Sequence, residues 1–532
     1  MKTKKSVIAL LFPLLVMGMA GCTGGKTPSS ETPSNNPSQT PSENPSEEPS
    51  EEPSEEPSEE PSEEPSENPS SEEGGIPKPA AQSVKVKFWN QFGQFVEAGV
   101  KSKIPAFVEA VKQNDGVDVE IELQRFGSYD ELADGIKNNY SVNNRPTMAV
   151  AYPDNVADYL NIDPNFVVNL DKFIDDPNIG FGKEAWLGDQ YDETDFVEEF
   201  FSEGSGYTVE GTYSLPFMKS TEIMFYNLEQ VISAFNYFKP EFESSETKIK
   251  EYMRTISWEE FLELAECINE HKEDISNMLE IPFWYDSDAN LFISKMFQEE
   301  IPYSSIDENG RGRIDFSSGE AFDKTVELLT ELKTAYQDGL FTTKGIKNTY
   351  GSTFFTDEKC VFSIGSSGGS GYNFPQAEAF TLGVCRVPAS NDNPLYVTQG
   401  PTIAMFSDDS LSADDDAAAQ YYAWKFMKYI TNAQVNAELC INGSEGYAPV
   451  RYSAYETAYF QEFMDEGEKY AQCYEVVVND INSDCGYLVT PAFKGSAALR
   501  DACESLLTAS IRGDDTIERL IQKAISEATQ KM

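Results

Sequence analysis

A repetitive tract near the N-terminus limits which part of this chain can form a packed core. Residues 28–73 are mostly proline, serine and glutamate, and the tetrad Pro-Ser-Glu-Glu repeats from Pro45 to Glu64. No apolar side chain larger than proline occurs in this tract, so nothing offsets the entropy of ordering it. Proline and like-charge repulsion favour extended chains of about 3.1 Å per residue, on the order of 140 Å for the whole tract. We expect a disordered spacer, with the folded part beginning near residue 80.

The residues before the spacer carry a secretion and lipidation signal. Three lysines precede a thirteen-residue apolar run at 7–19, which is shorter than the ~20 residues that cross a bilayer. The sequence Met-Ala-Gly-Cys22 follows and resembles a bacterial lipobox, in which the thiol of Cys22 is lipidated after cleavage. We predict a signal peptide over 1–21 and a lipidated, disordered spacer over 22–79, anchored to the membrane without spanning it. An ordinary signal peptide before an incidental cysteine is the alternative.

The length and charge of the remaining chain, residues 80–532, limit its possible functions. It is long enough for two lobes or domains, and the 12% aromatic content supplies material for a core. The formal net charge of −50 is opposite to that of a nucleic-acid-binding protein, so no nucleic-acid partner is expected. The acidity favours solubility and says little about a ligand.

The cysteines indicate neither a disulfide framework nor a zinc site. Their number after Cys22 is odd, their spacing is wide, and no C-x-x-C motif occurs. We expect buried small apolar side chains, although one chance disulfide stays open. The residues concerned are Cys267, Cys360, Cys385, Cys440, Cys473, Cys485 and Cys503.

Strand and helix patterns alternate along the folded part, which predicts an α/β protein. The first third shows strands at 84–88, 117–123 and 148–151, separated by a helix at 96–111, bent or restarted by Pro105, and one opened by Ser128-Tyr-Asp-Glu131. This order predicts parallel neighbouring strands, and ligands bind beyond the carboxyl ends of such strands. Those ends hold Asn90, Gln91, Tyr152 and Asp154.

The rest of the chain continues the mixture. We expect strands at 212–217, 222–227, 307–316 (after a turn), 360–364 and 396–406, and helices at 257–270, 320–337, 417–430, 495–511 and 516–529. No internal repeat occurs in this part of the sequence.

Seven segments, in order, resemble the family 1 extracellular solute-binding proteins, the bilobal receptors of carbohydrate ABC importers. They include Ser-Leu-Pro-Phe217 with Met-Phe-Tyr-Asn227, and Gly-Tyr-Ala-Pro-Val-Arg451. The others lie at 86–90, 256–261, 362–368, 397–402 and 511–517. The resemblance implies a type II periplasmic-binding-protein-like fold, in which several segments cross between two lobes that close on a ligand by a hinge motion. It places lobe 1 at about 80–215 plus 403–450 and lobe 2 at about 220–398 plus 451–532.

The resemblance also implies a set of ligand contacts, position by position. They are Asn90, Asp154, Lys219, Ser220, Thr221, Trp284 (as a stacking aromatic), Ser366, Ser367, Gly400, Thr402, Tyr447 and Arg500. Each has a structural alternative: Trp284 in the core, Ser366 and Ser367 as helix caps, Lys219 as a solvated charge, and Arg500 in a helix-face salt bridge.

No sequence motif supports a catalytic site or a metal site. Gly-Ser-Ser-Gly-Gly369 fits a nucleophile elbow with Ser367, but the single histidine, His271, precedes that serine, whereas the elbow's histidine follows it. Carboxylate pairs for a glycosidase are too numerous to be informative. Residues 480–484 begin like a calcium loop, but Cys485 replaces its glycine. We therefore predict a non-enzymatic protein without cofactor or metal.

The predicted function is capture of a carbohydrate for the membrane subunits of an ABC importer, by a monomer outside the cytoplasm. A glycerol phosphate is the alternative ligand, because the Lys-Ser-Thr221 segment, the Gly-Tyr-Ala-Pro449 loop and Arg500 resemble that branch of the family. A surface glycan-binding protein not coupled to transport is a third possibility.

Overall fold

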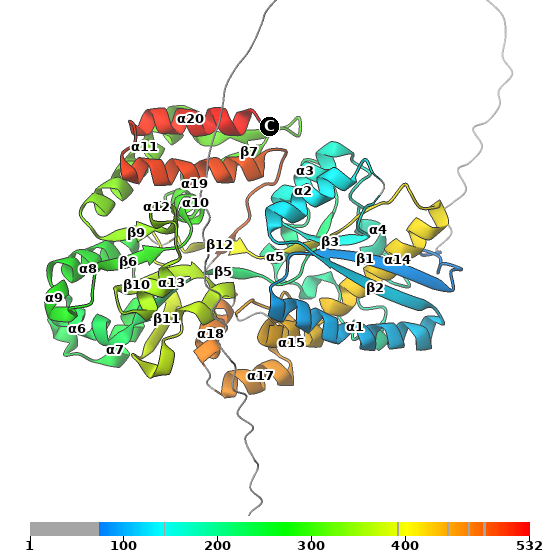
Figure 1. The fold of residues 1–532 in the computed structure, drawn as a ribbon, viewed down its shortest axis with the longest axis horizontal. Coiled ribbons are helices and arrows are strands. Elements are labelled where there is room, and N and C mark those ends of the chain that lie inside the picture. The colour runs from blue at the N-terminus through cyan, green and yellow to red at the C-terminus, as the bar shows by residue number, and fades with distance from the viewer. Residues whose placement is uncertain (1–73, 143, 391–392, 444–445, 467–468, 482–485) are drawn as a thin grey trace, which may run out of the picture. The chain divides into compact units, whose positions relative to one another are not determined.

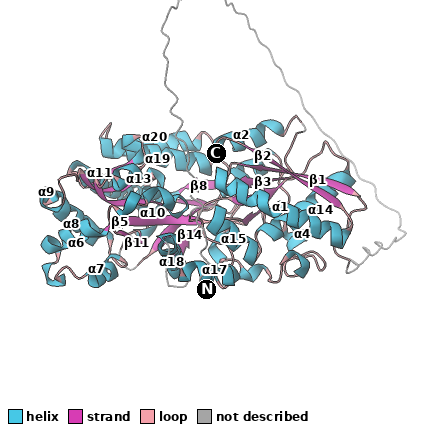
Figure 2. Cartoon of the chain, turned by 60° about the horizontal axis from the view of Figure 1, so that its bottom comes forward, coloured by secondary structure: helices cyan, strands magenta, loops and turns pink. Residues whose placement is uncertain are grey.

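The alternation of strands and helices builds two separate mixed β-sheets, each with its own helices (Figure 1). The computed structural model describes residues 74–532, except 143, 391–392, 444–445, 467–468 and 482–485. The predicted signal peptide, Cys22 and nearly all of the spacer lie outside the described residues. In Figure 2 helices lie on both sides of the strands, as expected for α/β lobes.

The first sheet, in lobe 1, has the strand order β2-β1-β3-β13-β4. Its strands are β1 (Ser83–Asn90), β2 (Asp118–Arg125), β3 (Met148–Ala151), β4 (Ser214–Pro216) and β13 (Thr402–Met405). β1 pairs in parallel with β2 and β3, which confirms the parallel arrangement expected from the sequence. β13 is antiparallel to both β3 and β4, so a late segment of the chain completes an early sheet.

The second sheet, in lobe 2, has the order β14-β12-β5-β10-β6-β9, and β11 pairs with β5 beside β12. Its strands are β5 (Ser220–Asn227), β6 (Ile281–Tyr285), β9 (Phe341–Thr343), β10 (Cys360–Ser366), β11 (Leu382–Arg386), β12 (Leu395–Gln399) and β14 (Gly486–Leu488). Every residue of β5 is buried, although it carries Ser220, Thr221 and Glu222. A separate hairpin pairs β7 (Ser304–Ile306) with β8 (Gly312–Ile314).

Helices account for most of the remaining described chain. In lobe 1 and the loops before β5 they are α1 (Gln94–Asp115), α2 (Tyr129–Asn139), α3 (Pro153–Ile162), α4 (Asp171–Ile174) and α5 (Glu198–Ser202). Those between β5 and β12 are α6 (Leu228–Phe238), α7 (Glu246–Met253), α8 (Trp258–Glu270), α9 (Lys272–Ile275), α10 (Asp288–Gln298), α11 (Gly319–Gln337), α12 (Lys344–Lys347) and α13 (Gly351–Thr356). The later ones are α14 (Ala413–Ile430), α15 (Ala433–Gly443), α16 (Tyr452–Tyr455), α17 (Ala458–Asp465), α18 (Lys469–Ile481), α19 (Ser496–Arg512) and α20 (Ile517–Thr529).

Two local expectations are wrong. The helix at 96–111 is neither broken nor restarted at Pro105, since α1 runs through it from Gln94 to Asp115. The proline removes a hydrogen bond to the carbonyl of exposed Lys101, while the opposite face, including Phe107, stays buried. The strand expected at 396–406 is two strands in different sheets, because the chain turns at Gly400, whose φ is +93°, and Pro401 lacks an N–H.

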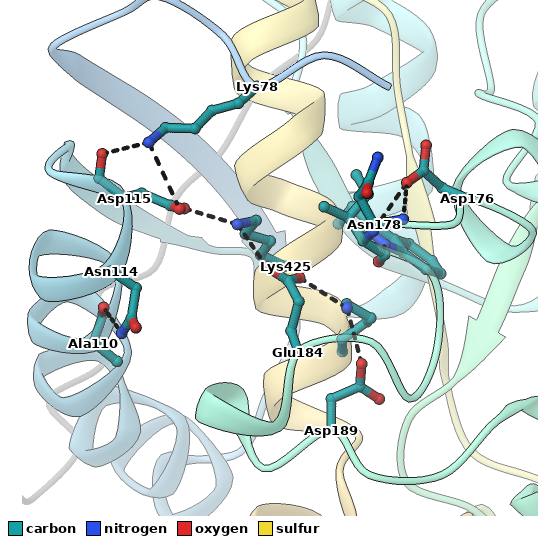
Figure 3. Close-up of polar contacts among 12 residues, drawn as sticks. Lys78, Ala110, Asn114, Asp115, Asp176, Asn178, Glu184, Asp189 and Lys425 are labelled. Atoms are coloured by element: carbon teal, nitrogen blue, oxygen red, sulfur yellow. Dashed lines mark hydrogen bonds and ion pairs between the residues drawn. The ribbon is translucent and has the colours of Figure 1, made fainter. Parts of the chain in front are cut away.

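Buried ion pairs fix α14 to the end of α1 and to a loop of lobe 1 (Figure 3). Lys425 Nζ lies 2.7 Å from carboxylate oxygens of both Asp115 and Glu184. Lys428 Nζ lies 2.9 Å from both Glu184 and Asp189. Burial opposes the charge of Lys425, but the neighbouring carboxylates outweigh it and raise the pKa of Lys425. Each buried cation thus lies between two carboxylates, which offsets the cost of burying its charge.

Two further sequence expectations concern residues that the structure describes. The six described cysteines form no disulfide with one another, and five of them are buried; Cys485 lies outside the described residues. Among the helices of the described part, none is both long enough and apolar enough to cross a membrane.

Candidate ligand-binding site

Three segments that lead from one sheet toward the other lie side by side. Residues 217–219 connect β4 to β5, residues 400–401 connect β12 to β13, and residues 446–451 lead away from α15. The Phe217 amide donates to the Pro401 carbonyl (3.2 Å), and the Lys219 amide donates to the Ala448 carbonyl (3.1 Å). Backbone hydrogen bonds therefore join the three segments at the boundary of the two lobes.

Two adjoining cavities open beside these segments. The larger, about 760 Å³, lies mainly in lobe 2 and is lined by the loop after β10, the ends of β5 and β6, α12, α13 and Tyr447. The smaller, about 500 Å³, lies between α2, α3 and α5 of lobe 1 and α10, α19 and β12 of lobe 2. Both are lined by Lys344, Gln399, Arg500 and Glu504, so we treat them as one cleft.

Tyrosine rings form the aromatic surface of the cleft. Tyr350 and Tyr372, on the lobe 2 side, are 56% and 72% exposed. Tyr447 is half-buried beside them, and Tyr129 and Tyr152 pack together on the lobe 1 side with ring centroids 4.7 Å apart. Exposed rings in a concave polar site provide faces onto which a partly apolar ligand can stack.

Three cations line the cleft and differ in their partners. Lys219 is buried and paired, with its Nζ 2.6 Å from a Glu203 oxygen and 3.0 Å from the Gly400 carbonyl oxygen. Lys344 Nζ lies 4.5 Å from the centre of the Tyr350 ring. Arg500 donates to the side-chain oxygen of Asn290 and takes part in none of the ion pairs found among the described residues. Lys344 and Arg500 are thus available to a ligand.

Four carboxyl groups in the cleft have raised pKa values, and burial is the main cause for each, including Asp501 of α19. Burial raises the pKa of Glu222 to about 7 and that of Asp286 to about 6, although hydrogen bonds received by each carboxyl partly oppose the rise. Burial also raises the pKa of Asp154, whose carboxylate accepts a hydrogen bond from the Ser496 hydroxyl. Together with Gln399, these groups offer hydrogen-bond donors and acceptors to ligand hydroxyls.

Half of the residues predicted from the sequence line this cleft. They are Asp154, Lys219, Ser366, Gly400, Tyr447 and Arg500. The Ser366 hydroxyl accepts from the Gly368 amide at 3.1 Å, so it also caps the turn after β10. The predicted helix-face salt bridge of Arg500 does not form with any described residue.

The other predicted residues lie outside the cleft lining. Trp284 is only 1% exposed and packs on Phe354 with ring centroids 4.6 Å apart, so its predicted stacking role is wrong. β6 is an inner strand with both faces covered, and Trp284 lies on the face that packs against Phe355, where apolar burial favours the indole.

The remaining five predicted residues form hydrogen bonds with main-chain groups or with a neighbouring serine. Asn90 accepts a hydrogen bond from the Phe92 amide, and Ser220 accepts one from Ser366. The Thr221 amide donates to the Ser367 hydroxyl, and the Thr221 hydroxyl donates to Val397. The Thr402 hydroxyl donates to Ala151. All five are buried, and their hydrogen bonds stay within one lobe, so these side chains support local structure and do not line the cavity.

Several residues that line the cleft are not among the ligand contacts predicted from the sequence. They are Glu222, Asp286, Asn290, Lys344, Tyr350, Tyr372 and Gln399. Only Glu222 carried a usable signal, as a single carboxylate within the apolar strand pattern of β5. Within the described chain, no group of three or more histidine, cysteine, aspartate or glutamate side chains is arranged to hold a metal ion.

Comparison with known proteins identifies the family. Residues 106–466 match the family model of the bacterial extracellular solute-binding proteins. No curated protein sequence matches the chain significantly.

The fold is shared with solved structures of solute receptors. The GacH receptor of Streptomyces glaucescens, solved unliganded and with acarbose, is 17% identical to this chain, with a TM-score of 0.56. The match covers 84% of this chain and 99% of the GacH chain. UgpB from Mycobacterium tuberculosis in complex with glycerophosphocholine is 15% identical, with a TM-score of 0.58 over 84% and 98%. The sugar-binding protein MalE from Xanthomonas citri is 14% identical, with a TM-score of 0.61 over 84% and 97%. Together with the family match, which covers more than half of the residues, this fold shows that the chain belongs to the bacterial extracellular solute-binding proteins, a family of binding proteins rather than enzymes.

Proposed function

We propose that this solute-binding protein captures a carbohydrate in the cleft and delivers it to the membrane subunits of an ABC importer. The observation that carries the proposal is the pair of exposed rings, Tyr350 and Tyr372, beside polar groups that converge at the lobe boundary. A sugar presents C–H faces that pack on aromatic rings and hydroxyls that need hydrogen-bond partners. The acarbose-bound receptor and the sugar-binding MalE among the fold neighbours support this choice.

The proposal includes a tether and a domain division. Lipidation of Cys22 and the spacer up to residue 79 would hold a monomeric receptor at the outer face of the cell membrane, after removal of a signal peptide over 1–21. The lobes we propose are 80–215 plus 403–450 and 220–398 plus 451–532, a division supported by the strand order of the two sheets. Replacing Cys22 by alanine should release the protein from the membrane into the medium.

The test for the ligand is a thermal-shift screen of the full chain with maltose, maltotriose and other oligosaccharides. A sugar present at 100 times its Kd should add about 2.7 kcal/mol to the free energy of unfolding. Tyr350→Ala and Tyr372→Ala should each weaken binding about 5- to 10-fold, since a stacked ring contributes roughly 1 kcal/mol.

Tyr237→Ala is the matched control, because Tyr237 is also exposed (44%) but stacks on His271 outside the cleft lining. The control should bind like the wild type. Equal effects of all three tyrosine substitutions, or no response to any sugar, would contradict the carbohydrate assignment.

A glycerol-phosphate-type ligand is the second candidate, because Arg500 faces the cleft and takes part in none of the ion pairs found among the described residues. A guanidinium without an ionic partner can bind a phosphate through two parallel hydrogen bonds. The glycerophosphocholine complex of UgpB supports this alternative. Stabilisation by glycerophosphocholine and not by sugars, lost in Arg500→Ala, would favour it over the carbohydrate.

A further inference from the structure

A chain of hydrogen bonds ends at Arg500, one of the two cations that line both cavities. Arg500 of α19 donates to the side-chain oxygen of Asn290. The amide nitrogen of Asn290, on α10, donates to a Glu222 oxygen at 2.9 Å. The second Glu222 oxygen accepts a hydrogen bond from the Tyr285 hydroxyl. Four elements, β5, β6, α10 and α19, therefore contribute one residue each to this chain.

The chemistry of these groups fixes the direction of every bond. An arginine side chain only donates hydrogen bonds, and an ionised carboxylate only accepts them. Asn290 lies between the two, so its oxygen must face Arg500 and its nitrogen must face Glu222. Asn290 and Glu222 are only 2% and 3% exposed, so water has little access to these hydrogen bonds.

Glu222 has no ordinary ion-pair role. Within the described part of the protein its carboxylate forms no ion pair with a lysine, arginine or histidine, and its partners are Tyr285 and Asn290. A buried carboxylate without a cation within 4 Å is costly, and its two oxygens accept hydrogen bonds from Tyr285 and Asn290. The strand that carries it begins directly after the crossing segment 217–219, so β5 holds Glu222 at the lobe boundary.

We propose that Glu222 is a positioning residue for the ligand: its carboxylate orients the Asn290 amide, and Asn290 in turn holds the Arg500 guanidinium in the cleft. This inference rests on the proposed function, since it assigns Arg500 a ligand contact. Glu222 is linked to Arg500 only through Asn290. It determines how rigidly the Arg500 guanidinium is held in the cleft.

Protonation of Glu222 should loosen the chain. A protonated Glu222 no longer offers acceptors alone, so it stops fixing the Asn290 amide nitrogen, and only the bond from Arg500 still orients the amide. The charged and titratable groups around Glu222 are Tyr285 and Asp286 of β6 and Arg500 of α19, while Lys344 of α12 lines the same cavity. Burial raises the pKa of Glu222 to about 7, which places this change near neutral pH.

The first test needs no ligand. In the full chain labelled with ¹⁵N-arginine, side-chain NMR should show slow rotation of the Arg500 guanidinium at pH 8, with its signal assigned by loss in Arg500→Lys. Glu222→Gln should speed that rotation several-fold at pH 8, and lowering the pH of the wild type to 6 should have the same effect. Unchanged rotation in Glu222→Gln would overturn the proposal.

The second test uses maltotriose and glycerophosphocholine as probes. Glu222→Gln should weaken the probe that binds by about 5- to 20-fold in the wild type and by less than 2-fold in the Arg500→Ala background. Equal losses in both backgrounds would show that Glu222 acts by another route and contradict the proposal. If neither probe binds, the proposed function is contradicted for these ligands, and the NMR measurement alone decides the role of Glu222.

The matched control is Asp480→Asn. Asp480, on α18, is also a buried carboxyl, and burial raises its pKa to about 7, but it lines a separate groove between β11 and α18. The control should leave both the rotation of Arg500 and the binding of either probe unchanged. A change as large as that of Glu222→Gln would mean that any buried carboxyl has this effect and would overturn the proposal.

Discussion

Gly400 forms the turn at which the chain leaves the second sheet for the first. Its φ is +93°, a conformation that side chains other than glycine rarely adopt. A Cβ atom here would lie 2.3 Å from the carbonyl oxygen of Met218, in the neighbouring crossing segment. Backbone conformation and close approach therefore both require glycine at this position.

Replacing Gly400 by alanine should destabilise the protein by about 2 to 4 kcal/mol, because the left-handed conformation and the contact with Met218 both become unfavourable. Urea denaturation followed by circular dichroism measures the change. Gly93→Ala is the control, since its φ is −59° and a Cβ there meets nothing within 4 Å. A loss no greater than that of the control would contradict the strained-turn account.

At the level of elements, α14 is held in lobe 1 by charge as well as by apolar packing. Lys428 is fully buried, and its ammonium donates to Glu184, Asp189 and the Gly180 carbonyl. All three donors of the ammonium group are thus satisfied. Removing this cation leaves two carboxylates buried with one fewer positive charge.

Lys428→Met should therefore cost about 3 to 5 kcal/mol of unfolding free energy, the usual effect of breaking a buried ion pair on one side. Lys523→Met on α20 is the control, because Lys523 is 69% exposed and its pair with Glu527 is at the surface. The control should change stability by less than about 1 kcal/mol. Similar midpoints of urea unfolding for the two variants would contradict the account.

Local patterns in the sequence predict most elements because periodicity and caps are short-range signals. The Ser257 capping box forms as expected, and β1, β2, β3 and β10 lie where alternation or apolar runs indicate them. The division of 396–406 into two strands depends on the tertiary path of the crossing segments. The sequence alone suggests a break only through the Gly400-Pro401 pair.

The site is harder to predict, because its residues come from segments far apart in the chain. Arg500 was found through family resemblance, whereas Tyr350 and Tyr372 lie in loops without any periodic signal. Trp284 illustrates the opposite error: a large aromatic ring beside a strand end is equally suited to a core and to a binding face. Only the packing of Phe354 against it decides between them.

For the molecule as a whole, buried carboxyl groups make stability depend on pH. Burial raises the pKa of Glu222 and of Asp480 to about 7, and that of Asp286 to about 6. Between roughly pH 4.5 and 7 the folded chain keeps protons that the unfolded chain has lost. The contribution of these groups to the free energy of unfolding is therefore largest at the acidic end of that window, and it decreases as the pH rises through the window.

We expect the unfolding free energy to be higher at pH 5.5 than at pH 7.5, with a slope of at most about 1.4 kcal/mol per pH unit for each group. Because the net charge of −50 adds self-repulsion with the same sign, the comparison of variants isolates the contribution of a single residue. Urea denaturation of Glu222→Gln should give a shallower pH dependence than that of the wild type. Identical slopes would mean that Glu222 does not titrate in this window.

A crystal structure of the protein with the oligosaccharide that stabilises it most would test the central claim directly. The account predicts electron density for an intact sugar in the cleft, in contact with Tyr350 or Tyr372 and within hydrogen-bond distance of Arg500 or Gln399. Sugar bound in the groove between β11 and α18, with the cleft unchanged, would contradict it.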